Sequence, residues 1–156
     1  MELDEAKRLS IELIENSLVA YLSTIDQDGF PITRGLSNTR YKERYPQFSK
    51  FFNKLEDKYV MYFSTNTSSS KIDHIKKNPK VSVYFCDPEV FKGFMLGGKV
   101  EIVHDMEIKR QFWADTSIRY YPKGVEDPDY TILQFSPENA SFYYKLQQVK
   151  FNLDER

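Results

Sequence analysis

The spacing of hydrophobic residues predicts a chain made mainly of short strands, with helices between some of them. Residues 81–85 alternate between apolar and polar side chains, and residues 59–64 are rich in aromatic and β-branched ones, so both segments are expected to be strands. Apolar residues recur every three or four positions at 4–16 and at 46–57, as they do on one face of a helix. The pattern indicates a mixed fold in which helices flank a sheet.

Glycine pairs and glycine-containing turns divide the predicted strands. Asp28-Gly29 predicts a tight hairpin turn, because glycine accepts the positive φ that such a turn requires. Gly97-Gly98 lies between two apolar runs and fits either a hairpin turn or a bulge within one long strand. Residues 120–129 contain two prolines and a glycine, and they are expected to form an ordered turn.

A short helix is expected directly after the strand at 59–64. Ser70 can cap its first turn, with Asp73 three residues later in the spacing of a capping box, and Asn78-Pro79 can end it. The first N–H groups of a helix lack partners within the helix and carry partial positive charge, so they attract anions. Hydroxyl donors and one cation stand beside this helix start: Thr65, Ser68, Ser69, Ser70 and Lys71.

Two interpretations of this helix start are open. In one, the hydroxyls and Lys71 form an anion site, most naturally for a phosphate group. In the other, serine and threonine occur here because they cap helices, and Lys71 is an ordinary solvated residue.

Composition limits the classes of function. The 156 residues suit one domain, 1–156, and a formal net charge of -1 gives no basic field to attract nucleic acid or an acidic membrane. No apolar run approaches the length of a membrane span, and the charged, amphipathic start differs from a signal peptide, so a cytoplasmic location is expected. Aromatic residues make up 15% of the chain, which suits a dimer interface or contact with a flat ring.

Cysteine and histidine do not indicate a metal centre. Cys86 is the single cysteine, so an internal disulfide is impossible, and a packing role is expected for it. His74 and His104 lack the spacing of a zinc site. The segment that begins at Asp26 has the start of a calcium loop, but Ser37 stands where the loop needs a glutamate. No metal ligand and no catalytic acid, base or nucleophile is therefore assigned.

Five segments, taken in order, match the pattern of one known family. Residues 59–87 contain F-S-T-N, S-S-K and N-P in the order strand, short helix, strand, and residues 18–39 contain a hairpin with R-G-L in its second strand. Residues 91–104 match a long strand, 105–114 a helix, and 120–144 contain Y-P-K-G-V-E-D-P-D-Y before two closing strands. These features resemble the pyridoxamine 5'-phosphate oxidase-like, FMN-binding split-barrel family.

The resemblance implies a fold and a preference between the two options at Gly97-Gly98. The implied fold is mainly β (α+β), a six-stranded antiparallel split β-barrel of Greek-key type with flanking helices. In that fold the glycine pair bends one long strand.

The resemblance also implies which residues bind the cofactor. The segment that matches the contact with the flavin ring and ribityl chain is Arg34, Gly35, Leu36, Ser37 and Asn38. The residues that match the end of the third strand are Phe63, Ser64 and Thr65. The residues that match the grip on the FMN phosphate are Ser70 and Lys71, with Ser69 as a helper. Taken alone, Arg34 also fits a surface salt bridge, although an arginine among apolar and small strand residues favours an anionic or planar partner.

The implied chemistry is hydride or electron transfer by bound FMN, with nicotinamide or another small-molecule reductant as donor. The arginine and histidine pattern that binds substrate near the end of true pyridoxamine phosphate oxidases is absent from KFNLDER at 150–156, so oxidation of vitamin B6 is not expected. The chain looks closest to the short general-stress-protein-like members, and a homodimer with flavin sites at its interface is expected. The open alternatives are a non-catalytic flavin-binding or stress-related protein and a relative that binds haem or a deazaflavin.

Overall fold

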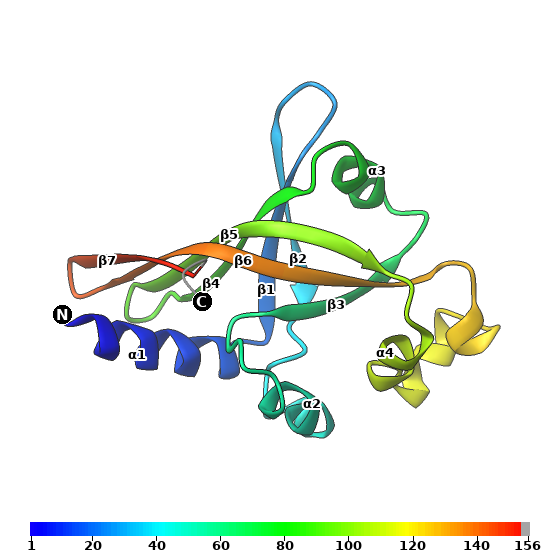
Figure 1. Ribbon diagram of the computed structural model, residues 1–156, viewed down its shortest axis with the longest axis horizontal. Coiled ribbons are helices and arrows are strands. Elements are labelled where there is room, and N and C mark those ends of the chain that lie inside the picture. Colours follow the sequence, from blue (N-terminus) through cyan, green and yellow to red (C-terminus); the bar gives the residue numbers. More distant parts are fainter. Residues whose placement is uncertain (154–156) are drawn as a thin grey trace.

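The computed structural model describes residues 1–153, which form a seven-stranded antiparallel sheet with helices around it (Figure 1). Residues 154–156, which belong to the segment 150–156 and to the expected domain 1–156, lie outside the described residues. The strands are β1 (Val19–Ile25), β2 (Pro31–Ser37), β3 (Met61–Asn66), β4 (Lys80–Asp87), β5 (Lys92–Val103), β6 (Tyr130–Tyr144) and β7 (Gln147–Asn152). The α-helices are α1 (Leu3–Glu15), α2 (Ser49–Asn53), α3 (Ser70–Lys77) and α4 (Met106–Gln111), and the 3-10 turns are Pro46–Phe48, Asp115–Arg119 and Gly124–Glu126.

The sheet is split between β2 and β3. Its strand order is β2-β1-β4-β5-β6-β3, so β2 and β3 are the two ends, and no ladder joins them within residues 1–153. Side chains that follow β2 cross this gap at one end. Thr39 Oγ1 donates to the carbonyl of Tyr62 at 2.6 Å, and Arg40 Nε donates to the carbonyl of Val60 at 2.9 Å. The expected class, a mainly antiparallel sheet with flanking helices, is confirmed.

One long strand replaces the two closing strands expected within 120–144. β6 runs through this region, pairing with β3 along its first half and with β7 along its second, and β7 makes the seventh strand. Opposite Pro137, the register of β5 shifts between Gly97 and Gly98, which confirms the bent strand. A Cβ on Gly98 would lie 2.3 Å from the carbonyl oxygen of Ser136, so only glycine lets the two backbones approach there.

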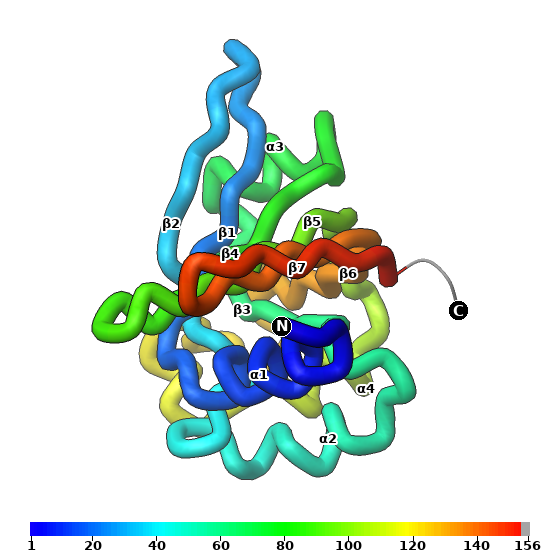
Figure 2. Tube along the Cα trace, turned by 90° about the vertical axis from the view of Figure 1, so that its left-hand side faces the viewer, coloured from blue at the N-terminus to red at the C-terminus, as the bar shows by residue number. Residues whose placement is uncertain are grey.

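The β1–β2 hairpin projects beyond the rest of the sheet, and α3 lies beside it (Figures 1 and 2). Its turn is the one expected at Asp28-Gly29, where Gly29 has a φ of +85°. The carboxylate of Asp26 accepts hydrogen bonds from the backbone N–H groups of Asp28 and Phe30, both at 2.9 Å. These contacts fix the hairpin turn, and α3 packs against β1.

Two hydrophobic clusters lie on opposite faces of β3 and β6. Phe63 and Phe135 belong to the main core, which α1 covers, whereas Tyr62 and Ile132 point the other way. The second cluster is built from Phe48, Phe52, Tyr62, Phe112, Tyr121, Tyr130 and Ile132. The phenylalanine-rich segment 46–57 therefore builds a second core behind the sheet.

Two expected helices are shorter than predicted. Residues 46–57 contain only the turn Pro46–Phe48 and α2, and the helix expected at 105–114 is confined to α4. Their apolar residues pack as single rings against the sheet, with Phe112 5.0 Å from Tyr62 between ring centroids. Ring packing of this kind satisfies the apolar pattern without a long helix. None of the helices within residues 1–153 has the length and apolar character needed to span a membrane.

Candidate functional site

The loop between β3 and α3 forms one wall of the candidate site. α3 begins at Ser70, and its N-cap is Ser69, whose hydroxyl accepts a hydrogen bond from the backbone N–H of Lys71 at 3.4 Å. The prediction of Ser70 as the cap, paired with Asp73, is therefore wrong by one residue. Ser69 has the extended backbone that a cap needs, with φ -71° and ψ 142°. The end of the helix before Asn78 is confirmed.

Lys71 turns back from α3 to the end of β3. Its Nζ donates to Thr65 Oγ1 and to Ser69 Oγ, both at 2.7 Å. Burial lowers the pKa of Lys71, and the positive charge of Arg34 lowers it further. The structure therefore brings Lys71, Thr65 and Ser69 together, and it adds Arg34, which the resemblance assigned to the flavin ring and ribityl chain.

Arg34 reaches the same place from β2. Its Nη1 donates to Thr24 Oγ1 at 2.7 Å and, at 3.4 Å, to the carbonyl of Leu22. Thr24 Oγ1 also lies 2.9 Å from Nδ1 of His74 on α3. Burial lowers the pKa of Arg34. Sequence reasoning assigned no role at the site to Thr24 or His74, although a threonine on the inward face of β1, in phase with Ala20 and Leu22, was an available signal.

The two cations have no acidic partner within the described part of the chain. The ion pairs there are Arg8–Glu12, Lys42–Glu15 and Lys99–Glu138, none of which includes Arg34 or Lys71. Holding two positive charges together without a carboxylate is unfavourable unless a further anion neutralises them. Hydroxyls and an arginine fork beside a lysine are the donors that a phosphate group accepts from.

The other predicted residues of β2 are divided between its two faces. Leu36 is half-buried on the same side as Arg34, whereas Gly35 and Ser37 are exposed on the opposite side. Asn38 is buried, and its Nδ2 donates to the carbonyls of Ile14 and Ser17, both at 2.7 Å. The structure therefore uses the side chain of Asn38 to join β2 to the end of α1, and does not bring it to the cations.

The predicted residues of β3 are divided in the same way. Phe63 lies in the main core, Ser64 is exposed on the other face, and Thr65 returns inward to meet Lys71. Ser70 is exposed beside the helix start. Within the described residues, β2 and β3 each have one edge that pairs with no other strand, and the carbonyl of Tyr62 on β3 accepts from Thr39 across the gap.

The comparisons with known proteins identify the family. A family model described as pyridoxamine 5'-phosphate oxidase matches residues 10–144. The chain belongs to this family. Among solved structures, it is similar to a protein from Clostridium acetobutylicum that is related to general stress protein 26 of B. subtilis (pyridoxinephosphate oxidase family), with 32% identity, 99% of each chain covered and a TM-score of 0.77.

More distant structures show the same fold. The general stress protein 26 of Bacillus anthracis str. Sterne is 21% identical over 97% of this chain and 100% of its own, with a TM-score of 0.67. A heme binding protein from Mycobacterium smegmatis is 13% identical over 94% of this chain and 57% of its own, with a TM-score of 0.68. The search of curated proteins gave no match.

In this member of the pyridoxamine 5'-phosphate oxidase family, the loop 120–129 supports the loop before α3. Asp129 Oδ1 accepts a hydrogen bond from the backbone N–H of Ser68 at 2.8 Å, and the carbonyl of Asp129 accepts one from Thr67, also at 2.8 Å. The hydroxyl of Tyr121 donates to Asn66 Oδ1 at 2.5 Å. The ordered turn expected at 120–129 therefore fixes the position from which Ser69 and Lys71 project.

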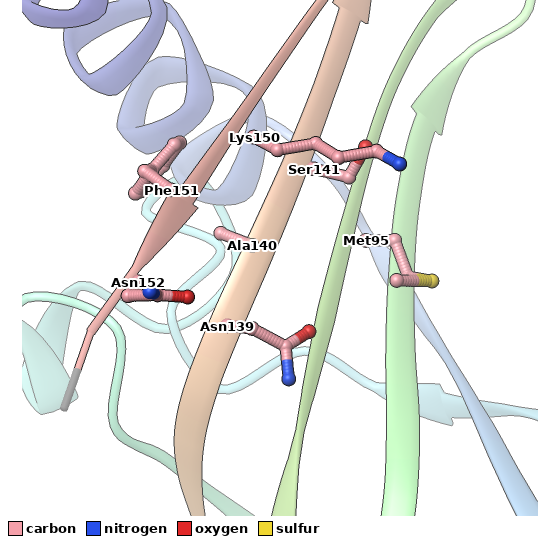
Figure 3. Close-up of a pocket in the computed structure, with 7 residues that line it drawn as sticks. All are labelled: Met95, Asn139, Ala140, Ser141, Lys150, Phe151 and Asn152. Carbon is pink, nitrogen blue, oxygen red and sulfur yellow. The ribbon is translucent and has the colours of Figure 1, made fainter.

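A second surface of this family member is apolar and lies on the outer face of the sheet. Its residues are Tyr21, Tyr84, Met95 and Tyr143, which are 38–43% exposed, and we call them the tyrosine face. The register places Tyr21 opposite Tyr84, and Tyr84 opposite Met95. A pocket between β5, β6 and β7 continues this surface (Figure 3). Met95, Ser141 and Lys150 lie on the outer side of the strands, and Phe151 points toward α1.

Proposed function

We propose that the chain is a cytoplasmic FMN-binding flavoprotein that holds the FMN phosphate between Arg34 and Lys71. The observation that carries the proposal is a pair of cations that form no ion pair with a carboxylate within residues 1–153, with the hydroxyl groups of Thr65 and Ser69 bonded to Lys71. Membership of the pyridoxamine 5'-phosphate oxidase family supports it. The donor set fits a phosphate dianion, because each cation has further N–H groups beyond those bonded within the protein.

The protein's own groups have distinct tasks in this proposal. Arg34 offers a planar fork that can bind two phosphate oxygens, whereas Lys71 offers a point charge. The exposed edges of β2 and β3 supply backbone donors and acceptors for the polar rim of the ring, and half-buried Leu36 supplies an apolar contact. When bound, FMN supplies the redox chemistry itself.

The phosphate contact is tested by replacing Lys71. Lys71→Ala should weaken FMN binding about ten- to a hundredfold, the usual effect of losing a hydrogen bond to a charged group. Riboflavin, which has no phosphate, should bind weakly to the wild-type protein and equally weakly to the variant. Lys76→Ala, an exposed lysine on the same helix, is the matched control and should bind FMN normally. Equal affinity of the wild-type protein for FMN and riboflavin would show that the phosphate site is wrong.

We further propose that the flavoprotein is an oxidoreductase with NADH or NADPH as donor. Since the sequence assigns no catalytic acid, base or nucleophile, we expect reactivity to belong to the flavin and a broad range of acceptors to be reduced slowly. Anaerobic mixing of the FMN-loaded protein with each nicotinamide should bleach the flavin absorbance. If neither donor reduces the flavin within minutes, a binding or storage role replaces the reductase. No oxidation of pyridoxamine phosphate is expected.

Haem is the second cofactor to test, because the heme binding protein of Mycobacterium smegmatis shares the fold. Haem iron usually needs an axial ligand such as histidine. Here His74 Nδ1 is already within hydrogen-bond distance of Thr24, and His104 is exposed on the loop after β5. The absorption spectrum of the purified protein separates haem from FMN.

We also propose a symmetric homodimer that uses the tyrosine face. Gly35 of β2 lies opposite Tyr21 in the register, so a second copy seated on this face would border the strand that carries Arg34. Each flavin site would then lie at the interface and include groups from both chains.

A further inference from the structure

Thr24 carries a hydroxyl group at a place where a strand in a core ordinarily carries an apolar side chain. It is fully buried on the inward face of β1, next to Leu22 and Ala20. Burying a hydroxyl is unfavourable unless its hydrogen bonds are satisfied. Thr24 Oγ1 lies 2.7 Å from Nη1 of Arg34 on β2 and 2.9 Å from Nδ1 of His74 on α3. This threonine of β1 therefore links β2 and α3.

Arg34 and His74 bond the same hydroxyl group. Arg34 can only donate, so the oxygen of Thr24 accepts from it. Nδ1 of His74 lies 2.9 Å from the same oxygen, where a hydroxyl group can act as donor or acceptor. The result is a hydrogen-bonded chain that links Arg34 on β2, Thr24 on β1 and His74 on α3.

These hydrogen bonds oppose the charge repulsion between Arg34 and Lys71. Arg34 and Lys71 are close enough that the charge of one affects the other, and neither has a carboxylate partner among the described residues. A long arginine side chain on an edge strand would otherwise turn toward solvent, where its charge is hydrated. The hydrogen bond to Thr24 holds the guanidinium beside Lys71 before any ligand arrives.

We propose that Thr24 and His74 are positioning residues, which hold Arg34 in the orientation that receives the phosphate of FMN. The proposal rests on the proposed FMN function and adds two residues to it. A group held in place before binding loses less conformational freedom when the ligand arrives, so the affinity is higher. The effect is confined to ligands that reach Arg34, which means those that carry a phosphate.

The test compares FMN with riboflavin in titrations of matched variants. Thr24→Val keeps the shape but removes the hydroxyl, and we expect FMN to bind about five- to twentyfold more weakly, with riboflavin unchanged. Thr24→Ser keeps the hydroxyl and should retain the affinity for FMN. Thr33→Val, which removes a hydroxyl from the outer face of β2, should bind both ligands as the wild-type protein does.

Two further experiments test whether Thr24 and His74 affect FMN binding through Arg34. His74→Leu removes the hydrogen-bond partner of Thr24 and should weaken FMN binding in the same selective way, whereas His74→Asn offers an amide group, which can donate or accept, and should restore much of it. In an Arg34→Met background, Thr24→Val should cause no further loss, because its effect passes through the missing guanidinium.

The outcomes separate this inference from the proposed function. If the wild-type protein does not prefer FMN to riboflavin, the proposed phosphate site itself fails. If the preference exists but Thr24→Val and His74→Leu keep it, only the positioning role is wrong. The same holds if the two variants lose riboflavin and FMN equally, or if the effects of Thr24→Val and Arg34→Met simply add.

Discussion

At the scale of single residues, burial and charge act together on Lys71 of the candidate anion site. Its ammonium is half-buried, it bonds two hydroxyls, and it stands near Arg34, so its pKa is lowered first by desolvation and then by repulsion. A bound phosphate dianion reverses the second effect, because it favours the charged form. Binding of FMN should therefore raise the pKa of Lys71.

This shift predicts the pH dependence of binding. The affinity for FMN should stay level near neutral pH and fall as the pH rises through the lowered pKa of Lys71, since the ligand must then recruit a proton. Titrations from pH 7 to about pH 10 check it, the upper bound lying near the ordinary lysine value. Riboflavin is the control for ionisation of the flavin itself. In Lys71→Met, the affinity for FMN should no longer fall with pH more steeply than the affinity for riboflavin does. An equal slope for wild type and Lys71→Met would contradict the assignment.

The lowered pKa of Lys71 also makes the free energy of unfolding depend on pH. The unfolded chain binds the proton of Lys71 more tightly than the folded protein does, so the free energy of unfolding rises with pH between the folded and unfolded pKa values. Below that window, the charged lysine opposes folding.

Residue chemistry also explains which site residues were predictable from sequence. Lys71, Ser69 and Thr65 are close together in the chain and stand at a helix start, so local pattern was enough to predict that they lie together. Thr24 and His74 are 50 positions apart and meet only because α3 packs beside β1. Asn38 shows the opposite case, since its place in a matching segment could not reveal that its amide is used to join β2 to α1.

At the scale of elements, the loop before α3 depends on one cap. Ser69 both caps the helix and accepts a hydrogen bond from Lys71 Nζ, whereas Ser70 is already helical and exposed. Ser69→Ala should therefore lower the free energy of unfolding by about 1 kcal/mol and should weaken FMN binding, because the lysine loses a partner. Ser70→Ala, the matched control, should change stability by a few tenths of a kcal/mol, roughly the effect of a surface substitution.

Urea unfolding of the two variants measures the difference. A larger loss for Ser70→Ala than for Ser69→Ala would show that the cap lies where the sequence pattern first placed it.

Elements were predictable where local chemistry decides them and less so where packing does. The hairpin at Asp28-Gly29 and the end of α3 at Asn78 follow from the properties of a few neighbouring residues. The segment 46–57 has a helical apolar pattern, but its rings pack against Tyr62 and Phe112 from only short turns of helix. Its partners come from distant parts of the chain, and no local pattern contains them.

At the scale of the whole molecule, the candidate cofactor site and the tyrosine face meet at the β1–β2 pair. Arg34 lies on the inward side of β2, and the tyrosine face begins on the outward side of β1, where Tyr21 is opposite Gly35 of β2. The pocket beside Met95, Ser141 and Lys150 extends the outer surface over β6 and β7 (Figure 3). A partner on this surface would therefore border the proposed flavin site through the β1–β2 pair.

This arrangement predicts that assembly and cofactor binding fail together. Light scattering of the FMN-loaded protein at micromolar concentration should give the mass of two chains. Tyr84→Glu places a charge at the centre of the tyrosine face, where burying it is unfavourable, so the variant should have the mass of one chain and should bind FMN more weakly. Tyr120→Glu makes the same substitution at a 76% exposed position in the turn after α4, and it should remain dimeric.

A wild-type protein with flavin bound and the mass of one chain would contradict the dimer. A dimeric Tyr84→Glu variant would place the interface on another surface, because a buried, unpaired carboxylate in the middle of the contact would not be tolerated.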